Sequence, residues 1–346
     1  MYKKKILVAG AGGFIGGYLV KKLLNLNADV IAVDIKPTDL WFQLHNESSN
    51  HSLDLKNYEN CEKIMIDIDY IFNLACNMGG MGFIENNKAE CMLSVLINTH
   101  LLSAAHKNNV SKYFFSSSAC IYNTNLQEKN FIEGLRESDA YPAMPENGYG
   151  WEKLFSERMC RHFYEDFNLN VSIARFHNVY GPFGTYDGGR EKSPAALCRK
   201  VAQAKIDNSN KIEIWGDGEQ TRSFLYIDDC IEGILRLFDS SFSDPINIGS
   251  DEQVSINQMV DIIQNIADMK SIQKIYLKDK PKGVRGRSSN NELSEKVLKW
   301  TYKVSLEDGL KKTYDWIYKD LIKHKNSLSK YSKSHILNLD KVESNK

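Results

Sequence analysis

The sequence predicts an α/β protein built on a doubly wound parallel sheet, with a smaller α/β domain towards the C-terminus. Short apolar, β-prone runs alternate with helical patterns over the first half of the chain, which favours parallel strands joined by helical crossovers. The length of 346 residues also exceeds the usual size of one domain, so we expect two closely joined domains.

The opening stretch, KKILVAGAGGFIGGYLVKKLLNLNADVIAVDI (residues 4–35), predicts a strand, a glycine turn, an amphipathic helix and a second strand. The later runs that we expect to form strands are HSLDL, YIFNLA, KYFFSSSACIY and VSIARFHNVYG. Helical patterns at 86–106 and 147–167 separate them, which completes the alternation.

After about residue 176 the alternation loosens, and glycines and loops become more frequent. RSFLYIDDCIEGILRLF (222–238) predicts a return into the first domain, followed by helices near 255–268 and 305–322. The boundaries that we expect are 1–175 with a return at 221–243 for the first domain, 176–220 and 244–323 for the second, and 324–346 for a polar, poorly ordered tail.

Composition narrows the class of protein. Forty-four basic residues balance forty-four acidic ones without a block of like charge, which argues against a nucleic acid or a membrane surface as partner. No apolar run approaches the ~20 residues of a membrane span. The seven cysteines are scattered and lack CxxC spacing, which predicts free thiols in the cytoplasm and no metal site.

The glycine turn predicts a dinucleotide site. Gly10, Gly13 and Gly16 are spaced GxxGxxG between strand and helix, so a diphosphate can approach the backbone N–H groups at the helix start. Asp34 ends the next strand, where its carboxylate would accept both ribose hydroxyls and repel a 2′-phosphate. We therefore expect NAD as cofactor, although Lys36 lies close by. The expected cofactor contacts are Gly10, Gly13, Phe14, Ile15, Gly16 and Asp34, with Asp54 and Leu55 either meeting the adenine or forming an ordinary turn.

YGWEK places Tyr149 and Lys153 four residues apart, on one face of a helix. A lysine ammonium beside a phenol favours the phenolate, so we expect the pKa of Tyr149 to be lowered and Tyr149 to act as a base. Lys153 would also hold the cofactor ribose. Ser118, at the end of the serine run, would hydrogen-bond the hydroxyl that is oxidised.

Together, the glycine turn, the serine run and YxxxK resemble the extended short-chain dehydrogenase/reductase family of nucleotide-sugar enzymes. The resemblance implies a Rossmann-like domain followed by a smaller sugar-nucleotide domain. It also implies a homodimer formed through a helical bundle, which the helices at 86–106 and 147–167 could supply.

Five further stretches are similar to the GDP-mannose 3,5-epimerase branch of that family: NMGGMGFIENN, SSACIY, RFHNVYGPFGTYDGGREKSPAALCRK, WGDGEQTRSF and GVRGRSSNN. The resemblance implies inversion of carbons 3 and 5 of GDP-mannose after transient oxidation at carbon 4. It assigns an acid/base pair to Cys120 and Lys192. On an extended strand, Cys120 would point the same way as Ser118, towards the substrate.

The same resemblance suggests the residues that hold the GDP-sugar. These are Gly79, Gly80, Met81, Gly82, Ser118, Asn178, Lys192, Arg222 and Arg285. His177 suits either the site or the core, and Arg199 and Arg287 are weaker candidates. One departure is Cys76-Asn77, where the branch has Ala-Asp.

Other functions remain open on the sequence. A related 4-epimerase, or a GDP-4-keto-sugar epimerase/reductase acting on another GDP-hexose or GDP-heptose, would share the first domain; the reductase needs NADPH, which Asp34 disfavours. A protein of another class could hold the cofactor without catalysis. It would have no reason to keep Tyr149, Lys153, Cys120 and Lys192 together.

Overall fold

The computed structural model describes residues 1–325, 327 and 329–331. Its main element is a seven-stranded, fully parallel sheet with strand order β11-β6-β5-β4-β1-β2-β3. The strands are β1 (Lys5–Ala9), β2 (Asp29–Asp34), β3 (Ser49–Ser52), β4 (Tyr70–Asn73), β5 (Lys112–Ser118), β6 (Asn170–Phe176) and β11 (Pro245–Ile248). This order confirms the predicted Rossmann-like, doubly wound fold.

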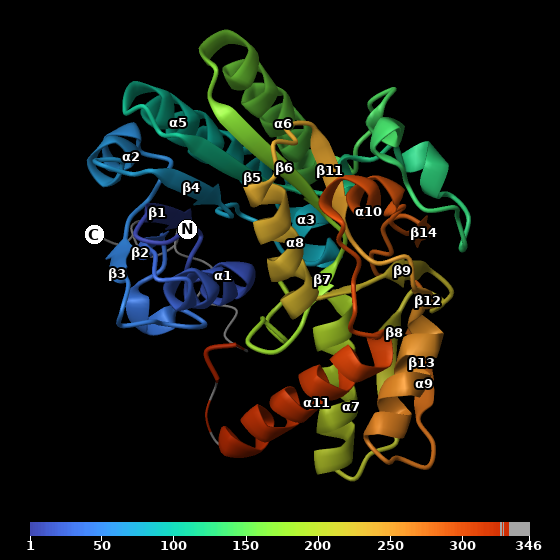
Figure 1. Ribbon diagram of the computed structural model, residues 1–346. Helices are drawn as coiled ribbons and strands as arrows, with labels where there is room; N and C mark the ends of the chain where they lie inside the picture. Colours follow the sequence, from blue (N-terminus) through green and yellow to red (C-terminus); the bar gives the residue numbers. More distant parts are fainter. Residues whose placement is uncertain (326, 328, 332–346) are drawn as a thin grey trace.

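Helices cover both faces of the sheet (Figure 1). One face carries α1 (Phe14–Asn25) and α8 (Ile227–Asp239), and the other carries α2 (Tyr58–Ile64), α5 (Ser94–Lys107) and α6 (Asn147–Phe167). In β1 the side chains alternate between these layers: Ile6 and Val8 join the core under α1 and α8, whereas Leu7 and Ala9 join the core under α5 and α6. The helix expected at 147–167 is confirmed with the same bounds. The one expected at 86–106 is divided into α3 (Met81–Asn86), α4 (Lys88–Met92) and α5.

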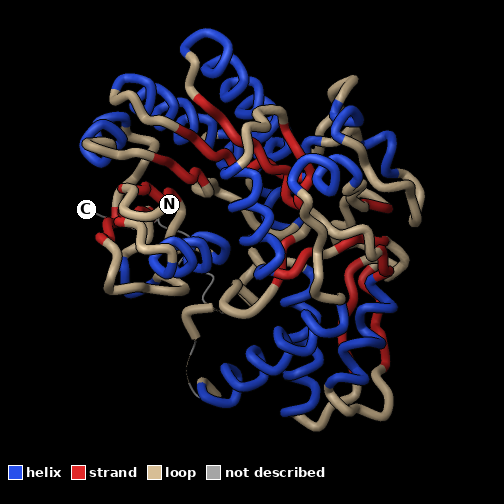
Figure 2. Tube along the Cα trace, in the orientation of Figure 1, coloured by secondary structure: helices blue, strands red, loops and turns tan. Residues whose placement is uncertain are grey.

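A second, smaller group of elements lies at the bottom of Figure 1. Figure 2 shows it as mainly helical, with short strands on one side. It comprises α7 (Ser193–Ile206), β8 (Lys211–Trp215), α9 (Ile256–Ile266), β13 (Gln273–Leu277) and α11 (Leu306–Lys323). The elements between the two groups are β7 (Val179–Tyr180), β9 (Thr221–Ser223), β10 (Leu225–Tyr226), β12 (Gln253–Ser255), β14 (Gly286–Arg287) and α10 (Glu292–Leu298).

The return into the large sheet extends further than we predicted. We expected it to end at residue 243, but β11 runs from Pro245 to Ile248 and pairs in parallel with β6. The proline reads as a break in the sequence. It is accommodated because β11 is the edge strand of the sheet, where a missing N–H costs little.

Most of the predicted tail, residues 324–346, lies outside the described residues, but Tyr331 contradicts the prediction for its own position. Its side chain is buried, and its ring lies 5.4 Å from that of Phe42 and 4.8 Å from that of Trp316. Its hydroxyl donates to the Phe42 carbonyl at 2.7 Å. The polar composition of the tail hides this single aromatic anchor. Among the described residues, no helix is both long and apolar enough to cross a membrane.

Candidate active site

A cavity of about 370 Å³ opens at the carboxyl ends of β1, β2, β4 and β5, where doubly wound sheets bind ligands. All but one of the expected cofactor contacts line it: Gly10, Gly13, Phe14, Ile15, Gly16, Asp34, Asp54, Leu55 and Tyr149. The remaining one, Lys153, lies beneath Tyr149. Ser118 and Lys192 also line the cavity, so the two ends of the predicted site share one space.

The turn after β1 has room only for glycine. Gly10 has φ +81°, and a Cβ on Gly16 would lie 2.1 Å from the Gly10 carbonyl oxygen. Gly13 caps α1 without any side-chain hydrogen bond, so the first N–H groups of this helix have no capping partner from it. These features suit a diphosphate that lies against the backbone.

Asp34 ends β2 at the cavity, and its Oδ1 accepts a hydrogen bond of 3.0 Å from the Lys36 backbone N–H. The Lys36 ammonium donates to the Gly12 carbonyl at 2.6 Å and lies 4.0 Å from the centre of the Phe42 ring. The lysine that might have bound a 2′-phosphate is thus engaged by the turn itself.

Tyr149 and Lys153 lie on α6 as expected, with the ammonium 5.7 Å from the centre of the Tyr149 ring. Burial raises the pKa of Tyr149 well above its ordinary value, so our expectation of a lowered pKa is wrong. The hydroxyl lies in an apolar cluster, and neither Lys153 nor the hydrogen bond from Ser118 offsets that burial. Burial lowers the pKa of Lys153, but Cys76 and Glu152 outweigh it, so the ammonium is retained.

The position of Cys120 differs from our reasoning. β5 ends at Ser118, and Ala119–Ile121 form a 3₁₀ turn in which the Cys120 N–H donates to the Ser118 side chain at 3.2 Å. Cys120 therefore does not continue the strand. The turn nevertheless packs its side chain against the cluster that contains Tyr149, and Arg287 Nη1 donates to its Sγ at 3.4 Å.

Cys120 and Lys192 lie within electrostatic reach of each other. Burial raises the pKa of the Cys120 thiol, which Arg287 and Lys192 oppose. Burial lowers the pKa of Lys192, which Cys120 opposes. A thiol whose pKa is raised and an amine whose pKa is lowered are thus coupled electrostatically. Lys192 lines the same cavity as Ser118 and Tyr149, whereas Cys120 is not among the lining residues and packs against the cluster that contains Tyr149.

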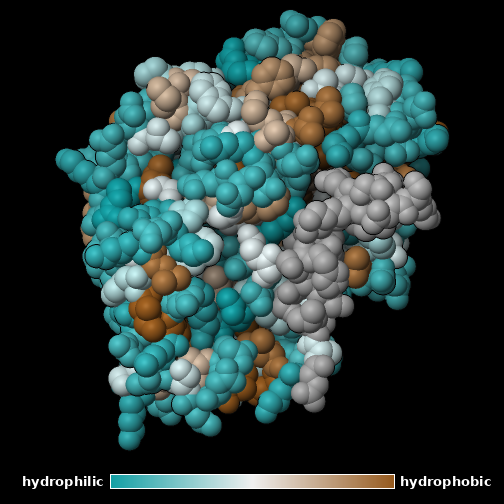
Figure 3. Space-filling view, turned by 180° about the vertical axis from the view of Figure 1, so that it is seen from behind, coloured by the Kyte–Doolittle hydropathy of each residue, from teal (hydrophilic) through white to brown (hydrophobic). Residues whose placement is uncertain are grey.

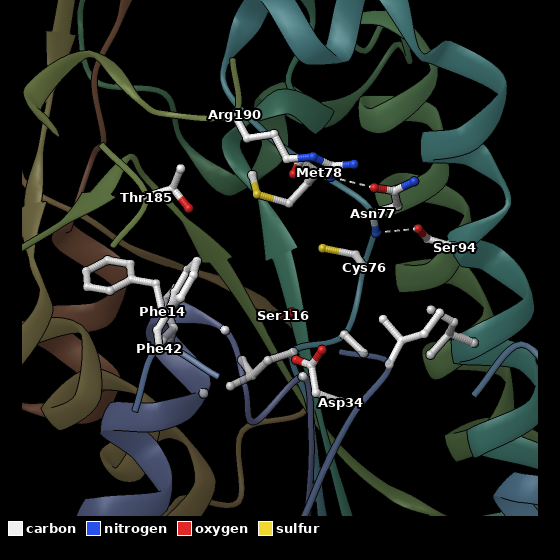
Figure 4. A pocket seen from close by; sticks show the side chains of 18 of the residues that line it. Phe14, Asp34, Phe42, Cys76, Asn77, Met78, Ser94, Ser116, Thr185 and Arg190 are labelled. Carbon is white, nitrogen blue, oxygen red and sulfur yellow. Dashed lines mark hydrogen bonds between the residues drawn. The ribbon is translucent and has the colours of Figure 1, made fainter. Parts of the chain in front are cut away.

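The loop at 79–82 does not line the cavity within the described part of the chain but supports one of its walls. The Gly80 N–H donates to the Arg190 carbonyl at 3.0 Å, and a Cβ on Gly80 would lie 2.2 Å from the Glu191 carbonyl oxygen. Arg190 reaches back to Asn77 Oδ1 at 2.6 Å, and the Asn77 N–H donates to Ser94, as Figure 4 shows. The Cys76-Asn77 departure therefore lies in the cavity wall, in direct contact with the GGREK segment.

Apart from Lys192, the substrate residues expected in the second domain lie outside the cavity lining and have internal partners. Asn178 Nδ2 donates to the Ser223 carbonyl at 3.0 Å, and Arg222 Nη2 donates to the Val284 carbonyl at 2.7 Å. Arg285 pairs with Asp217 at 3.0 Å. Arg199, a weaker candidate, donates to the Tyr186 carbonyl at 3.1 Å.

His177 is a core histidine. It is fully buried, its Nε2 lies 2.9 Å from Asn247 Oδ1, and burial lowers its pKa to about 3. Sequence reasoning missed Glu146, which pairs with the buried Arg287 at 2.8 Å. No sequence signal links these two, because they are far apart in the chain and meet only through the fold.

A family model described as "NAD dependent epimerase/dehydratase family" matches residues 6–249. The chain belongs to this family. It is 45% identical over 324 residues to GDP-mannose 3,5-epimerase 1 of Oryza sativa subsp. indica, covering 93% of this chain and 84% of that protein. It is 43% identical over 337 residues to GDP-mannose 3,5-epimerase of Arabidopsis thaliana, covering 96% and 88%.

Solved epimerases share the fold. UDP-glucose 4-epimerase of Thermotoga maritima, solved with UDP-glucose, superimposes with a TM-score of 0.83 at 25% identity, over 92% of this chain and 99% of that chain. UDP-glucuronic acid 4-epimerase of Bacillus cereus, solved with UDP-glucuronic acid and NAD, gives 0.77 at 28% identity, over 91% and 99%.

Membership in the NAD dependent epimerase/dehydratase family makes NAD the cofactor. The side chains present fit it, because a Cβ would fill the cradle at Gly16 and because Asp34 supplies a carboxylate at the end of β2. Gly10, Gly13 and Gly16 would hold the diphosphate, Asp34 the adenosine ribose, and Tyr149 with Lys153 the nicotinamide end.

Proposed function

We propose that the protein is a nucleotide-sugar epimerase that inverts carbons 3 and 5 of GDP-mannose, giving GDP-L-galactose, with GDP-L-gulose as the product where carbon 5 alone is inverted. The observation that carries the proposal is that Cys120 and Lys192 lie within electrostatic reach of each other, with Lys192 in the cavity that Ser118 and Tyr149 line and Cys120 packed against the Tyr149 cluster. A 4-epimerase needs only the oxidising groups, whereas inversion at carbons 3 and 5 needs a second acid/base pair. The plant relatives named GDP-mannose 3,5-epimerase support this choice.

The protons on carbons 3 and 5 of a hexose are not acidic until carbon 4 becomes a ketone. Bound NAD would supply the hydride acceptor for carbon 4 and, once reduced, the hydride that restores it. Tyr149 takes the proton of the carbon 4 hydroxyl, while Ser118 hydrogen-bonds the same oxygen. Burial raises the pKa of Tyr149 and disfavours its phenolate, so the base needs nearby positive charge; the Lys153 ammonium, 5.7 Å from the centre of the Tyr149 ring, is the group placed to supply it.

With a ketone at carbon 4, an enolate can hold the charge left when a neighbouring proton is removed. Cys120 and Lys192 would act on opposite faces of the sugar, one removing a proton and the other returning one. Burial lowers the pKa of Lys192, which favours its neutral amine as the base, and raises the pKa of Cys120, which keeps its thiol protonated as the acid. No net oxidation occurs, so the cofactor recycles in place.

We assign the GDP end of the substrate to Asn178, Arg222 and Arg285, with the loop 79–82 against the sugar. The support is electrostatic: the charges of Arg287 and Arg285 act on Arg222 and are offset in part by Glu146. Burial, followed by the charge of Arg287, lowers the pKa of Arg222 to about 10, and an anionic diphosphate would relieve that repulsion.

We also propose a homodimer formed through α5 and α6. Figure 3 shows apolar side chains at the surface near the top of the molecule, where Figure 1 has these helices. The large apolar side chains exposed on and beside them include Met92, Leu93, Leu96, Trp151 and Phe155. A second copy would cover this surface. The seven free cysteines favour a cytoplasmic location.

The decisive experiment incubates the protein with GDP-mannose in heavy water, without added cofactor, and examines the recovered sugar by NMR. We expect deuterium at carbons 3 and 5. The variant Cys120→Ala should lose exchange while staying folded, and Cys198→Ala, which removes a buried thiol from α7, should retain it. Absence of exchange at both carbons in the unmodified protein would refute the assignment.

A further inference from the structure

Glu146 is a buried carboxylate at the start of α6 that the mechanism above does not use. It occupies the N-cap position of the helix, yet its side chain makes no capping hydrogen bond. Its Oε2 instead accepts from Arg287 Nη2 at 2.8 Å, in an ion pair whose two side chains are 6% and 3% exposed. The Glu146 carboxylate thus binds a buried guanidinium instead of the free N–H groups of its own helix, which indicates a role other than helix capping.

The guanidinium connects Glu146 to the thiol. Arg287 Nε donates to Gln127 Oε1 at 2.7 Å, and Nη1 donates to Cys120 Sγ at 3.4 Å. The main chain closes the arrangement, because the Glu146 N–H donates to the Cys120 carbonyl at 2.9 Å. The orientation of the guanidinium against the sulfur is therefore fixed by groups that do not themselves react.

We propose that Glu146 is a positioning residue that holds Arg287 against Cys120 and limits the positive charge that the thiol experiences, so that the thiol stays protonated and can donate its proton to the substrate. The inference rests on the proposed epimerase function and adds to it a residue that tunes the acid/base group.

An acid/base group that is used in every turnover must be able both to lose its proton and to take it back. A lone guanidinium 3.4 Å from sulfur would stabilise the thiolate, and a strongly stabilised thiolate is a weak base. With Glu146 ionised, the pair next to the thiol carries no net charge. Burial raises the pKa of Glu146, but Arg287 and Arg222 outweigh it and lower the pKa overall, so the carboxylate is charged.

The other groups that face this cluster come from several elements. Lys192, before α7, acts on Cys120; Arg222, on β9, acts on Glu146; and Glu85, on α3, experiences the charge of Glu146. The charge of Cys120 acts on Tyr149, on α6, and the charge of Arg285 acts on Arg222. Arg287 contacts both the thiol and Glu146, and Glu146 also interacts directly with the Cys120 side chain.

The test measures the rate at which iodoacetamide alkylates Cys120 as a function of pH, read from the Cys120 peptide by mass spectrometry in the NAD-loaded protein. Glu146→Gln keeps an oxygen acceptor but removes the charge. We expect the titration midpoint to fall by about one pH unit, and alkylation below both midpoints to be about tenfold faster. Glu85→Gln removes a nearby charge that does not contact Arg287, and we expect no shift. An unchanged or raised midpoint in Glu146→Gln, or an equal fall in Glu85→Gln, overturns the proposal.

A double-mutant cycle tests whether Glu146 acts on the thiol through Arg287. Arg287→Gln should raise the midpoint, and adding Glu146→Gln to that variant should then shift it by less than half as much as in the unmodified background. An equal shift in both backgrounds means that the carboxylate acts directly on the thiol and refutes a positioning role. If Glu146→Gln fails to fold, Glu146→Asp replaces it: its shorter reach should give a smaller fall, and no fall at all refutes the idea.

Deuterium exchange keeps the two proposals separate. If GDP-mannose exchanges at neither carbon but the midpoint still moves as expected, the substrate assignment fails and the role of Glu146 stands. If exchange occurs in the unmodified protein, its pH profile in Glu146→Gln should move to lower pH together with the thiol midpoint. A profile that stays in place while exchange is intact overturns the role of Glu146.

Discussion

The helix that carries Tyr149 and Lys153 is attached to the sheet by a buried ion pair, and replacing Glu157 with glutamine tests how much this attachment stabilises the protein. Arg175, on β6, donates to Glu157 through Nε at 3.0 Å and through Nη2 at 2.8 Å, and both side chains are 3% exposed. Ser117 donates to the same carboxylate. Glu157→Gln leaves the guanidinium buried without its counterion, for which we expect a loss of about 3–5 kcal/mol in the free energy of unfolding.

Urea unfolding followed by circular dichroism measures this loss. The matched control is Glu165→Gln on the same helix, where Glu165 pairs with Arg161 at 2.6 Å but the side chains are 42% and 33% exposed. Water screens that pair, so the control should lose less than about 1 kcal/mol. If Glu157→Gln costs no more than Glu165→Gln, burial does not control the strength of the pair, and the reasoning is refuted.

Three further predictions follow from other parts of the molecule. Burial lowers the pKa of His177 to about 3, so as the pH falls below about 6.5 the unfolded state takes up a proton that the folded state does not. Between pH 7 and pH 5 the free energy of unfolding should therefore drop by about 2 kcal/mol more in the unmodified protein than in His177→Asn. Equal drops in the two proteins would contradict this. Phe155→Glu, on the exposed apolar surface, should give a monomer by analytical ultracentrifugation, and a persistent dimer places the interface elsewhere. The Tyr331→Ala variant should release NAD faster in dilution experiments, because the Tyr331 hydroxyl is hydrogen-bonded to Phe42, which lines the cofactor cavity. An unchanged release rate would show that Tyr331 does not influence cofactor binding.

The parts of the fold that the sequence predicts well are those set by local patterns. The strand–glycine–helix unit around Gly10 and the helix at 147–167 follow from periodicity and from the demand of a tight turn for glycine, and both occur as expected. Asp34 also falls where a strand end was predicted. These features depend on neighbours within a few residues, so one sequence is enough to locate them.

The sequence-based predictions are wrong where contacts outside the local pattern decide the structure. KYFFSSSACIY looks like one continuous strand, but Ser118 turns its side chain to the Cys120 N–H and ends β5 in a 3₁₀ turn. The lowered pKa expected for Tyr149 came from its spacing to Lys153 alone. Its actual direction is set by burial in a cluster that includes Cys91 and Ile84, which the spacing does not report.

The surroundings of Cys120 show that sequence motifs can suggest an acid/base residue but do not identify the groups that control its reactivity. The thiol comes from the end of β5, its arginine from β14 and the carboxylate on that arginine from the start of α6. Arg287 and Glu146 are neighbours only because the segment after the large sheet returns to cover the carboxyl ends of its strands. The reactivity of the thiol therefore depends on the contact between the two groups of elements. A substitution that shifts one group against the other should change the pH at which Cys120 titrates, while the structure of the glycine turn around Gly10 stays unchanged.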